Sequence, residues 1–189
     1  MTDGVTAELL SKVSDISAKQ WDALNPQGNP FVSHAFLSAL EQSGSVGLGT
    51  GWSPSPVIIR DAEGVPAAAL PAYLKTHSQG EYVFDHHWAD AFHRAGGQYY
   101  PKLQIAVPFS PVPGPRLLLR DPALASAILA AAEAVVDQNG LSSAHATFVE
   151  EGELELFRAA GWLTRMGTQF HWQNRDYADF DGFLSALSP

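Results

Sequence analysis

The densest group of chemically active side chains lies between Tyr82 and Arg116. This stretch holds three of the seven histidines and three of the five tyrosines, and four of the thirteen prolines fall between Pro108 and Pro115. A segment that only packs in a core rarely combines carboxylates, imidazoles, phenols and prolines so closely. We therefore predict that it builds a substrate cleft. The candidate catalytic residues are Asp85, His86, Tyr99 and Tyr100.

Each of these candidates also has a structural interpretation. Asp85 is either a general base or the N-cap of the following helix. Tyr99 and Tyr100 are either proton donors or an aromatic lid with surface hydroxyls. His86 and His93 are two turns apart, with the expected helix beginning between them, so we expect no shared metal ion.

A second candidate site is the proline-rich run from Pro108 to Arg116. Proline has no N–H group, so the remaining backbone donors are those of Val112, Gly114 and Arg116. Together with the Arg116 guanidinium they could bind an anion. The alternative is a rigid bend with Arg116 in solvent. His34, at the expected start of a helix, is either a pocket residue or simply exposed.

Composition excludes several classes of protein. The chain has 189 residues, of which 46% are hydrophobic and 16% charged, which fits one globular domain. A net charge of −9 disfavours a nucleic-acid duplex or a membrane surface as partner. Without cysteine there is no thiol nucleophile and no Cys-based zinc site. We see no signal peptide or spanning segment and expect a cytoplasmic protein.

Periodicity and turn residues predict alternating helices and strands. We expect a first strand at Leu9–Ile16 and a β-hairpin of Val57–Arg60 with Val65–Leu74 around Asp61–Gly64. The further expected strands are Tyr82–Asp85, Lys102–Val107, Ala144–Val149 and Trp162–Gln173. The expected helices are Ala18–Leu24, His34–Ser43, Trp88–Ala95, Pro122–Gln138, Glu153–Ala160 and Phe180–Leu187.

This order predicts an α/β fold with one mixed sheet covered on both faces. It resembles the GNAT (acyl-CoA N-acyltransferase) fold, with an inserted strand–helix segment at about residues 77–101. The phrase Glu155-Leu-Phe-Arg-Ala-Ala-Gly-Trp162 is similar to a late helix-to-strand junction of that fold. We expect residues 1–178 to form this domain, and residues 179–189 to begin a helix that leads toward a second half.

Four further phrases resemble the FemAB-like N-acyltransferases, a bacterial group with the GNAT fold. They are Ser33–Glu41, Tyr99–Gln104, Pro108–Arg116 and Gln169–Asn174. Members of that family are about twice this length, and the chain resembles their first half. The resemblance implies transfer of an acyl or aminoacyl group to an amine. It implies acyl-CoA or an aminoacyl donor as co-substrate and no tightly bound cofactor.

Two departures from the GNAT pattern leave a second interpretation open. The Gly-rich signature that binds the acyl carrier is missing before the helix that begins at Pro122. The position that often holds the acidic tyrosine is Phe157, which cannot donate a proton. The chain is therefore either an N-acyltransferase domain or a non-catalytic GNAT-like half that serves as scaffold or binding module for a second domain or partner.

The C-terminal residues predict that this part of the chain packs on a partner surface. Phe180, Phe183, Leu184 and Leu187 form an apolar stripe on one helix face, which needs a partner surface. An unpaired sheet edge beside the strand expected at Trp162–Gln173 would invite another chain. We expect either self-association through that edge or a second GNAT-like half.

Overall fold

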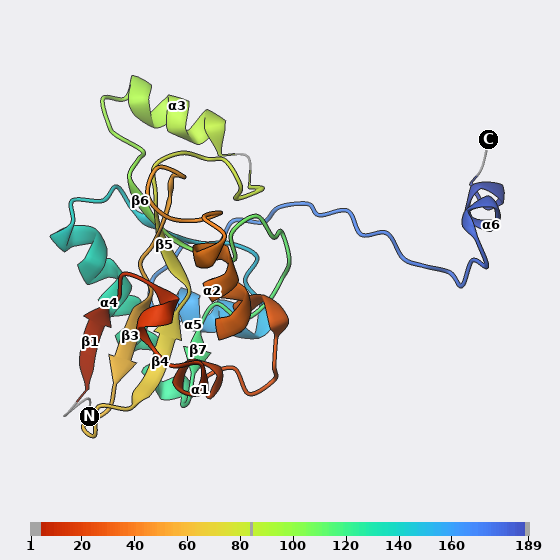
Figure 1. Ribbon diagram of the computed structural model, residues 1–189. Coiled ribbons are helices and arrows are strands. Elements are labelled where there is room, and N and C mark those ends of the chain that lie inside the picture. Colours follow the sequence, from red (N-terminus) through yellow and green to blue (C-terminus); the bar gives the residue numbers. More distant parts are fainter. Residues whose placement is uncertain (1–4, 84, 188–189) are drawn as a thin grey trace.

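The computed structural model describes residues 5–83 and 85–187. Its helices are α1 (Ala18–Asp22), α2 (His34–Gln42), α3 (His86–Arg94), α4 (Ala125–Gln138), α5 (Glu151–Ala159) and α6 (Phe180–Ser185). Its strands are β1 (Thr6–Leu9), β2 (Trp52–Pro54), β3 (Val57–Arg60), β4 (Pro66–Leu70), β5 (Ala72–Lys75), β6 (Lys102–Ile105), β7 (Leu118–Leu119) and β8 (Ala144–Ala146). Figure 1 shows their arrangement.

The strands form two four-stranded sheets, in the orders β1-β3-β4-β7 and β2-β5-β6-β8. The single sheet expected from the sequence is wrong in this respect, because the predicted strand Val65–Leu74 is divided at Pro71. Proline cannot donate to a ladder, so the chain changes partners there. The two sheets still meet, since the Pro71 carbonyl accepts from the Ala106 N–H at 3.0 Å.

Side-chain alternation on β3 explains why helices cover both faces of the first sheet. Val57 and Ile59 pack with Ile128 and Leu129 of α4 in one core cluster. Ile58, between them, points the other way into a second cluster with Trp21 of α1 and Leu37 of α2. The predicted hairpin is confirmed by the antiparallel pairing of β3 with β4.

The insertion between β5 and β6 is partly as predicted. Helix α3 runs from His86 to Arg94, close to the expected Trp88–Ala95. The short strand expected at Tyr82–Asp85 is wrong: Tyr82, Val83 and Asp85 lie in bends and turns, and Phe84 lies outside the described residues. Bends suit this segment because Asp85 turns inward to a buried lysine, as described below.

Two other strand predictions are wrong at the ends of the domain. The first strand is Thr6–Leu9 rather than Leu9–Ile16, because Val13–Asp15 forms a 3₁₀ turn. Residues 162–173 form no strand; beyond α5 the chain is extended and leads away from the body to α6 (Figure 1). Trp172 is therefore exposed rather than packed in the core. Within the described residues, no helix is long and apolar enough to cross a membrane.

Candidate functional site

Two buried lysines face each other where the insertion leaves and re-enters the sheet. Lys75 ends β5 and Lys102 begins β6, and the two residues are directly paired across the antiparallel ladder. Their side chains have no exposed area. Two like charges opposite each other in a sheet repel, so this arrangement requires nearby anions.

The insertion supplies those anions. Lys102 Nζ donates to Glu81 Oε2 and to Asp85 Oδ2, both at 2.8 Å. Lys75 Nζ lies 3.9 Å from Glu81 Oε1 and donates to the Gln79 carbonyl at 2.9 Å. The ring of Trp52 lies against the same ammonium, at 3.8 Å. Charge pairing thus holds the insertion onto the end of the sheet.

Burial and pairing shift the pKa values in this cluster. Burial opposes ionisation of Asp85, but hydrogen bonds from Lys102 and Tyr99 outweigh it and lower the pKa of Asp85 to about 2. Burial lowers the pKa of Lys75 to about 8, although Glu81 opposes the change. Burial raises the pKa of Glu81, which Lys102 only partly offsets.

The two candidate tyrosines border this cluster. Tyr99 donates from its hydroxyl to Asp85 Oδ2 at 2.9 Å, and the Tyr100 hydroxyl hydrogen-bonds to Ser78 Oγ. Burial raises the pKa of Tyr99, and it raises the pKa of Tyr100 to about 12. Both phenols therefore keep their protons near neutral pH and act as donors.

A pocket of about 280 Å³ lies between α3 and the first residues of the insertion. Helix α3 contributes His86, Asp90 and His93, and Tyr100 from the segment before β6 also lines the pocket. The other lining residues are Thr76, His77, Ser78, Gln79 and Ala89. This pocket brings imidazoles, a carboxylate and a phenol together, so it can accept and donate protons.

The structure brings all four predicted catalytic residues to this region, but in two layers. His86 and Tyr100 line the pocket. Asp85 and Tyr99 bond each other behind it, and the Asp85 side chain is buried. Asp85 caps α3 without a side-chain hydrogen bond, because its carboxylate is turned to Lys102. Of the four, only His86 and Tyr100 are in direct reach of a ligand in this pocket.

His34 has partners within the fold. Its Nε2 atom lies 2.9 Å from the Ile16 carbonyl, and its Nδ1 atom lies 3.2 Å from Ser38 Oγ. Both ring nitrogens are thus occupied. The bond to Ile16 links α2 to the turn before α1, and the bond to Ser38 lies within α2.

The predicted anion donors of the proline-rich run are also occupied. The N–H of Val112 donates to the Ser110 carbonyl, that of Gly114 to the Phe148 carbonyl, and that of Arg116 to the Glu153 carboxylate. An anion at this run would have to displace these partners.

Arg116 is buried and bonds the backbone rather than lying in solvent. Its guanidinium donates to the carbonyls of Thr147 at 2.8 Å, Val112 at 2.8 Å and Pro115 at 3.1 Å. Burial lowers its pKa to about 10. The expected alternative with Arg116 in solvent is therefore wrong, and the side chain stabilises the bend.

Arg116 lies where the parallel strands β6 and β8 separate. Their ladder ends at the pairing of Ile105 with Ala146, and beyond it Val149 bridges to Gly114 instead. The Arg116 side chain reaches the Thr147 carbonyl at this point. The backbone just before α4 offers no free donor at Ala123 either. Its N–H already donates to the Asp121 side chain.

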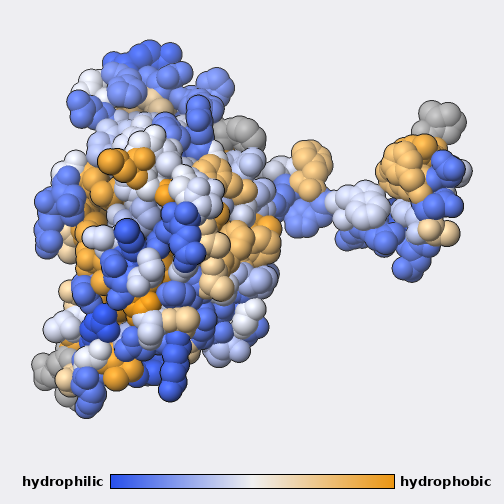
Figure 2. Space-filling model, viewed as in Figure 1, coloured by the Kyte–Doolittle hydropathy of each residue, from blue (hydrophilic) through white to orange (hydrophobic). Residues whose placement is uncertain are grey.

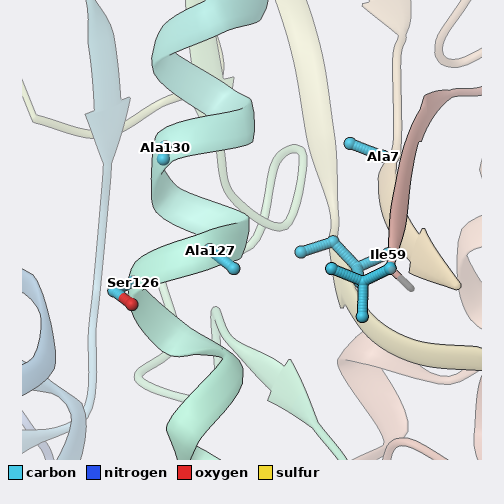
Figure 3. Close-up of a pocket in the computed structure, with 6 residues that line it drawn as sticks. Ala7, Ile59, Ser126, Ala127 and Ala130 are labelled. Carbon is cyan, nitrogen blue, oxygen red and sulfur yellow. The ribbon is translucent and has the colours of Figure 1, made fainter. Parts of the chain in front are cut away.

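Another hollow, about 420 Å³ in volume, lies between β1 and α4 (Figure 3). Its lining is Val5, Ala7, Ile59, Ser126, Ala127 and Ala130, with no titratable side chain. It offers no acid or base. Among residues 5–83 and 85–187, no group of three or more His, Asp or Glu side chains could hold a metal ion.

Sequence reasoning missed Lys75, Lys102 and Glu81. Lys75 ends one strand and Lys102 begins the next, and the two bracket a segment that contains three acids, Glu81, Asp85 and Asp90. The two lysines on either side of these acids were the available signal in the sequence. To infer a buried cluster from them, one must know that the lysines pair across the strands, and the sequence does not supply that register.

Comparison with solved structures identifies the fold. The aminoglycoside 6'-N-acetyltransferase AAC(6')-Ih from Acinetobacter baumannii superimposes with a TM-score of 0.52 and 16% identity, over 90% of this chain and 99% of that one. AAC(6')-Iy, solved with the bisubstrate analogue CoA-S-monomethyl-acetylneamine, gives a TM-score of 0.50 and 15% identity over 90% and 98%. The chain therefore has the GNAT acyl-CoA N-acetyltransferase fold, as predicted.

A comparison with protein families is more specific. The FemAB-like family, described as peptidoglycan biosynthesis/recognition, matches residues 12–189. The chain belongs to this family, which confirms the resemblance drawn from the sequence. No curated protein matches it.

Replacing Lys102 with methionine should lower the free energy of unfolding by about 3–5 kcal/mol, because Glu81 and Asp85 then remain buried without their main cation. Chemical denaturation at neutral pH measures it. Lys19→Met, on the surface of α1, is the control and should cost little. Adding Glu81→Gln and Asp85→Asn to Lys102→Met should recover part of the loss. A cost below about 1 kcal/mol for Lys102→Met would contradict the buried ion pairs.

Asp85 should make stability depend on acid pH. Its pKa is about 2 in the folded chain against an ordinary 3.8, so its ionised form stabilises the fold above that ordinary value. This contribution is lost as the pH falls toward 2. The stability difference between the wild type and Asp85→Asn should therefore narrow on acidification. Thermal melts of both proteins across this range test it, with exposed Asp137→Asn as control; a constant difference for Asp85→Asn would refute the shift.

Replacing Arg116 with alanine should lower the free energy of unfolding by about 2–4 kcal/mol, because one buried and two partly buried carbonyls lose a charged donor. Arg120→Ala, four residues along, is the control. Arg120 bonds Asp61 at the surface, so its loss should cost under about 1 kcal/mol. Equal melting temperatures for the Arg116 variant and the wild type would show that Arg116 does not hold the bend.

Proposed function

We propose that this chain is an N-acyltransferase domain that transfers an acyl or aminoacyl group to an amine acceptor in the pocket beneath α3. The observation that carries the proposal is the meeting of His86, His93 and the Tyr100 hydroxyl in one pocket. The GNAT fold supports the reaction class. The family description favours an amine of the bacterial cell wall as acceptor.

The chemistry requires one proton acceptor and one proton donor. The acceptor amine must lose a proton as its nitrogen attacks the acyl carbonyl carbon, and imidazole is the side chain most often used for this step. The bond from that carbon to the donor's leaving atom then breaks. Tyr100 stays protonated near neutral pH and can donate to the leaving atom or the oxyanion. In this scheme His86 is the base and Tyr100 the acid.

The remaining candidates act behind the pocket. Asp85 fixes Tyr99 and Lys102, and this buried group holds the insertion that carries His86. It therefore positions the catalytic pair without touching the substrate. The net charge of −9 attracts a cationic amine.

The donor enters this proposal as a co-substrate, either acyl-CoA or an aminoacyl compound. AAC(6')-Iy has been solved with a CoA-linked analogue. In this chain the buried Arg116 guanidinium donates to the Thr147 carbonyl just beyond β8, so we infer that the donor approaches from the open side of the pocket. Such donors are made in the cytoplasm, where this proposal places the reaction.

A second candidate is a non-catalytic half that binds a partner domain. The occupied donors around Arg116 favour it, because they leave no free N–H in the proline-rich run for an acyl carrier. Phe157 favours it too, since this residue is buried against Trp162 and carries no acid.

Product formation from a panel of acyl-CoA and aminoacyl donors with amine acceptors, followed by mass spectrometry, separates the two candidates. Given activity, His86→Ala and Tyr100→Phe should each lower kcat about 100-fold. His87→Ala and Tyr82→Phe are matched controls outside the pocket lining and should keep the wild-type rate. Equal losses for His86→Ala and His87→Ala would place the reaction elsewhere. No product from any donor would support the binding module.

A further inference from the structure

Residues 164–173 carry the pattern of a half-buried β-strand. Thr164, Met166, Thr168, Phe170 and Trp172 alternate with Arg165, Gly167, Gln169, His171 and Gln173. Side chains of a strand alternate between its two faces, so the first set would form one face of apolar and threonine side chains. The second set would form a polar face. Such a division is typical of a strand with one side on a core.

The structure leaves this strand without a sheet. No backbone hydrogen bond joins residues 163–178 to any other described residue. Leu163, Met166, Phe170 and Trp172 are exposed by 99%, 81%, 95% and 66%. Figure 2 shows the segment leading away from the body to apolar side chains at its far end. Large apolar side chains exposed in a row mark an interaction surface.

The edge of the second sheet at β8 has no further strand beside it among the described residues. Among the residues that the structure describes, β8 is the last strand of its sheet and pairs only with β6. The Leu103 N–H donates to the Ser143 carbonyl and the Thr147 N–H to the Ile105 carbonyl, so the N–H groups of Ala144 and Ala146 face the open side. Ala144 and Ala146 also pack on the main core cluster. A strand added here would extend that core.

Charge favours a contact between tail and body. Residues 163–175 contain Arg165 and Arg175 and no acid, a charge of +2. Residues 1–162 contain nine Lys or Arg and seventeen Asp or Glu, a charge of −8. A second copy of this chain therefore supplies both the edge and the complementary charge.

Two polar side chains of the tail contact the chain's own body, whereas its large apolar side chains stay exposed. Arg165 lies over the ring of Trp88 on α3 at 5.6 Å, and Gln169 donates to the Pro111 carbonyl. The chain after α5 leads away from the body toward α6 (Figure 1). Phe170 and Trp172 of this segment are exposed. They would each bury about 150–250 Å² on a partner.

We propose that two copies of this chain exchange residues 163–173, each tail adding a strand to the open edge of β8 in the other copy. The exchange is reciprocal, so the interface closes with two-fold symmetry and leaves neither edge free. It also covers Met166, Phe170 and Trp172. This inference is independent of the proposed reaction.

Light scattering coupled to size exclusion tests the proposal on the full chain. The wild type should have twice the mass of one chain. The double variant Phe170→Glu/Trp172→Glu should be monomeric, because it places charges on the apolar face. The matched control His171→Glu/Gln173→Glu adds the same charges to the polar face and should stay dimeric. The tail makes no backbone bond to the body, so these variants should fold.

Hydrogen exchange identifies the edge that is used. The amides of Ala144 and Ala146 should be protected in the wild type and should exchange faster in the Phe170→Glu/Trp172→Glu variant. A monomeric wild type would overturn the proposal, including one in which the tail pairs with its own β8. So would a dimer that survives both double substitutions, or a dimer in which these two amides stay unprotected.

Discussion

The paired lysines Lys75 and Lys102 impose the strongest constraint on this structure. Two ammonium groups directly opposed in a ladder and removed from water are tolerated only when carboxylates neutralise them. Glu81 and Asp85 do so, and both belong to the insertion. The insertion is therefore part of the domain's electrostatic balance rather than an appendage. Because α3 follows directly after Asp85, the same contacts determine where His86 lies.

The bend at Pro71 connects this constraint to the rest of the fold. It lets one continuous segment serve two sheets, with β4 buried between the helix layers and β5 carrying Lys75 to the insertion. At the other end of β6 the chain enters the proline-rich run. There the Arg116 guanidinium donates to backbone carbonyls instead of to water. One end of this sheet thus has a pocket with acid and base groups, and the other is closed by the protein's own side chains.

Sequence patterns predicted the parts of this structure that local chemistry controls. The hairpin at Val57–Leu70 and the helices α2 and α3 follow from turn residues and periodicity. The grouping of Asp85 with Tyr99, and of His86 with Tyr100, was also predicted as one region. The pairing of Lys75 with Lys102 and the burial of Arg116 depend on register and on contacts between residues distant in sequence. The strand expected at Trp162–Gln173 has the right periodicity and no partner, because pattern specifies a face but not what covers it.

The two ends of the second sheet differ in what it would cost to bind a ligand there. In the proline-rich run the N–H groups of Arg116, Gly114 and Val112 already donate to Glu153, Phe148 and Ser110. Opening the site would cost these bonds and expose a buried guanidinium, so ligand binding there must offset several kcal/mol of native structure. The pocket under α3 carries no such cost, because His86 and His93 are already exposed. This difference in cost supports our proposal that the pocket under α3, at the end that the buried lysines organise, is the site of the reaction, while Arg116 holds the bend at the other end.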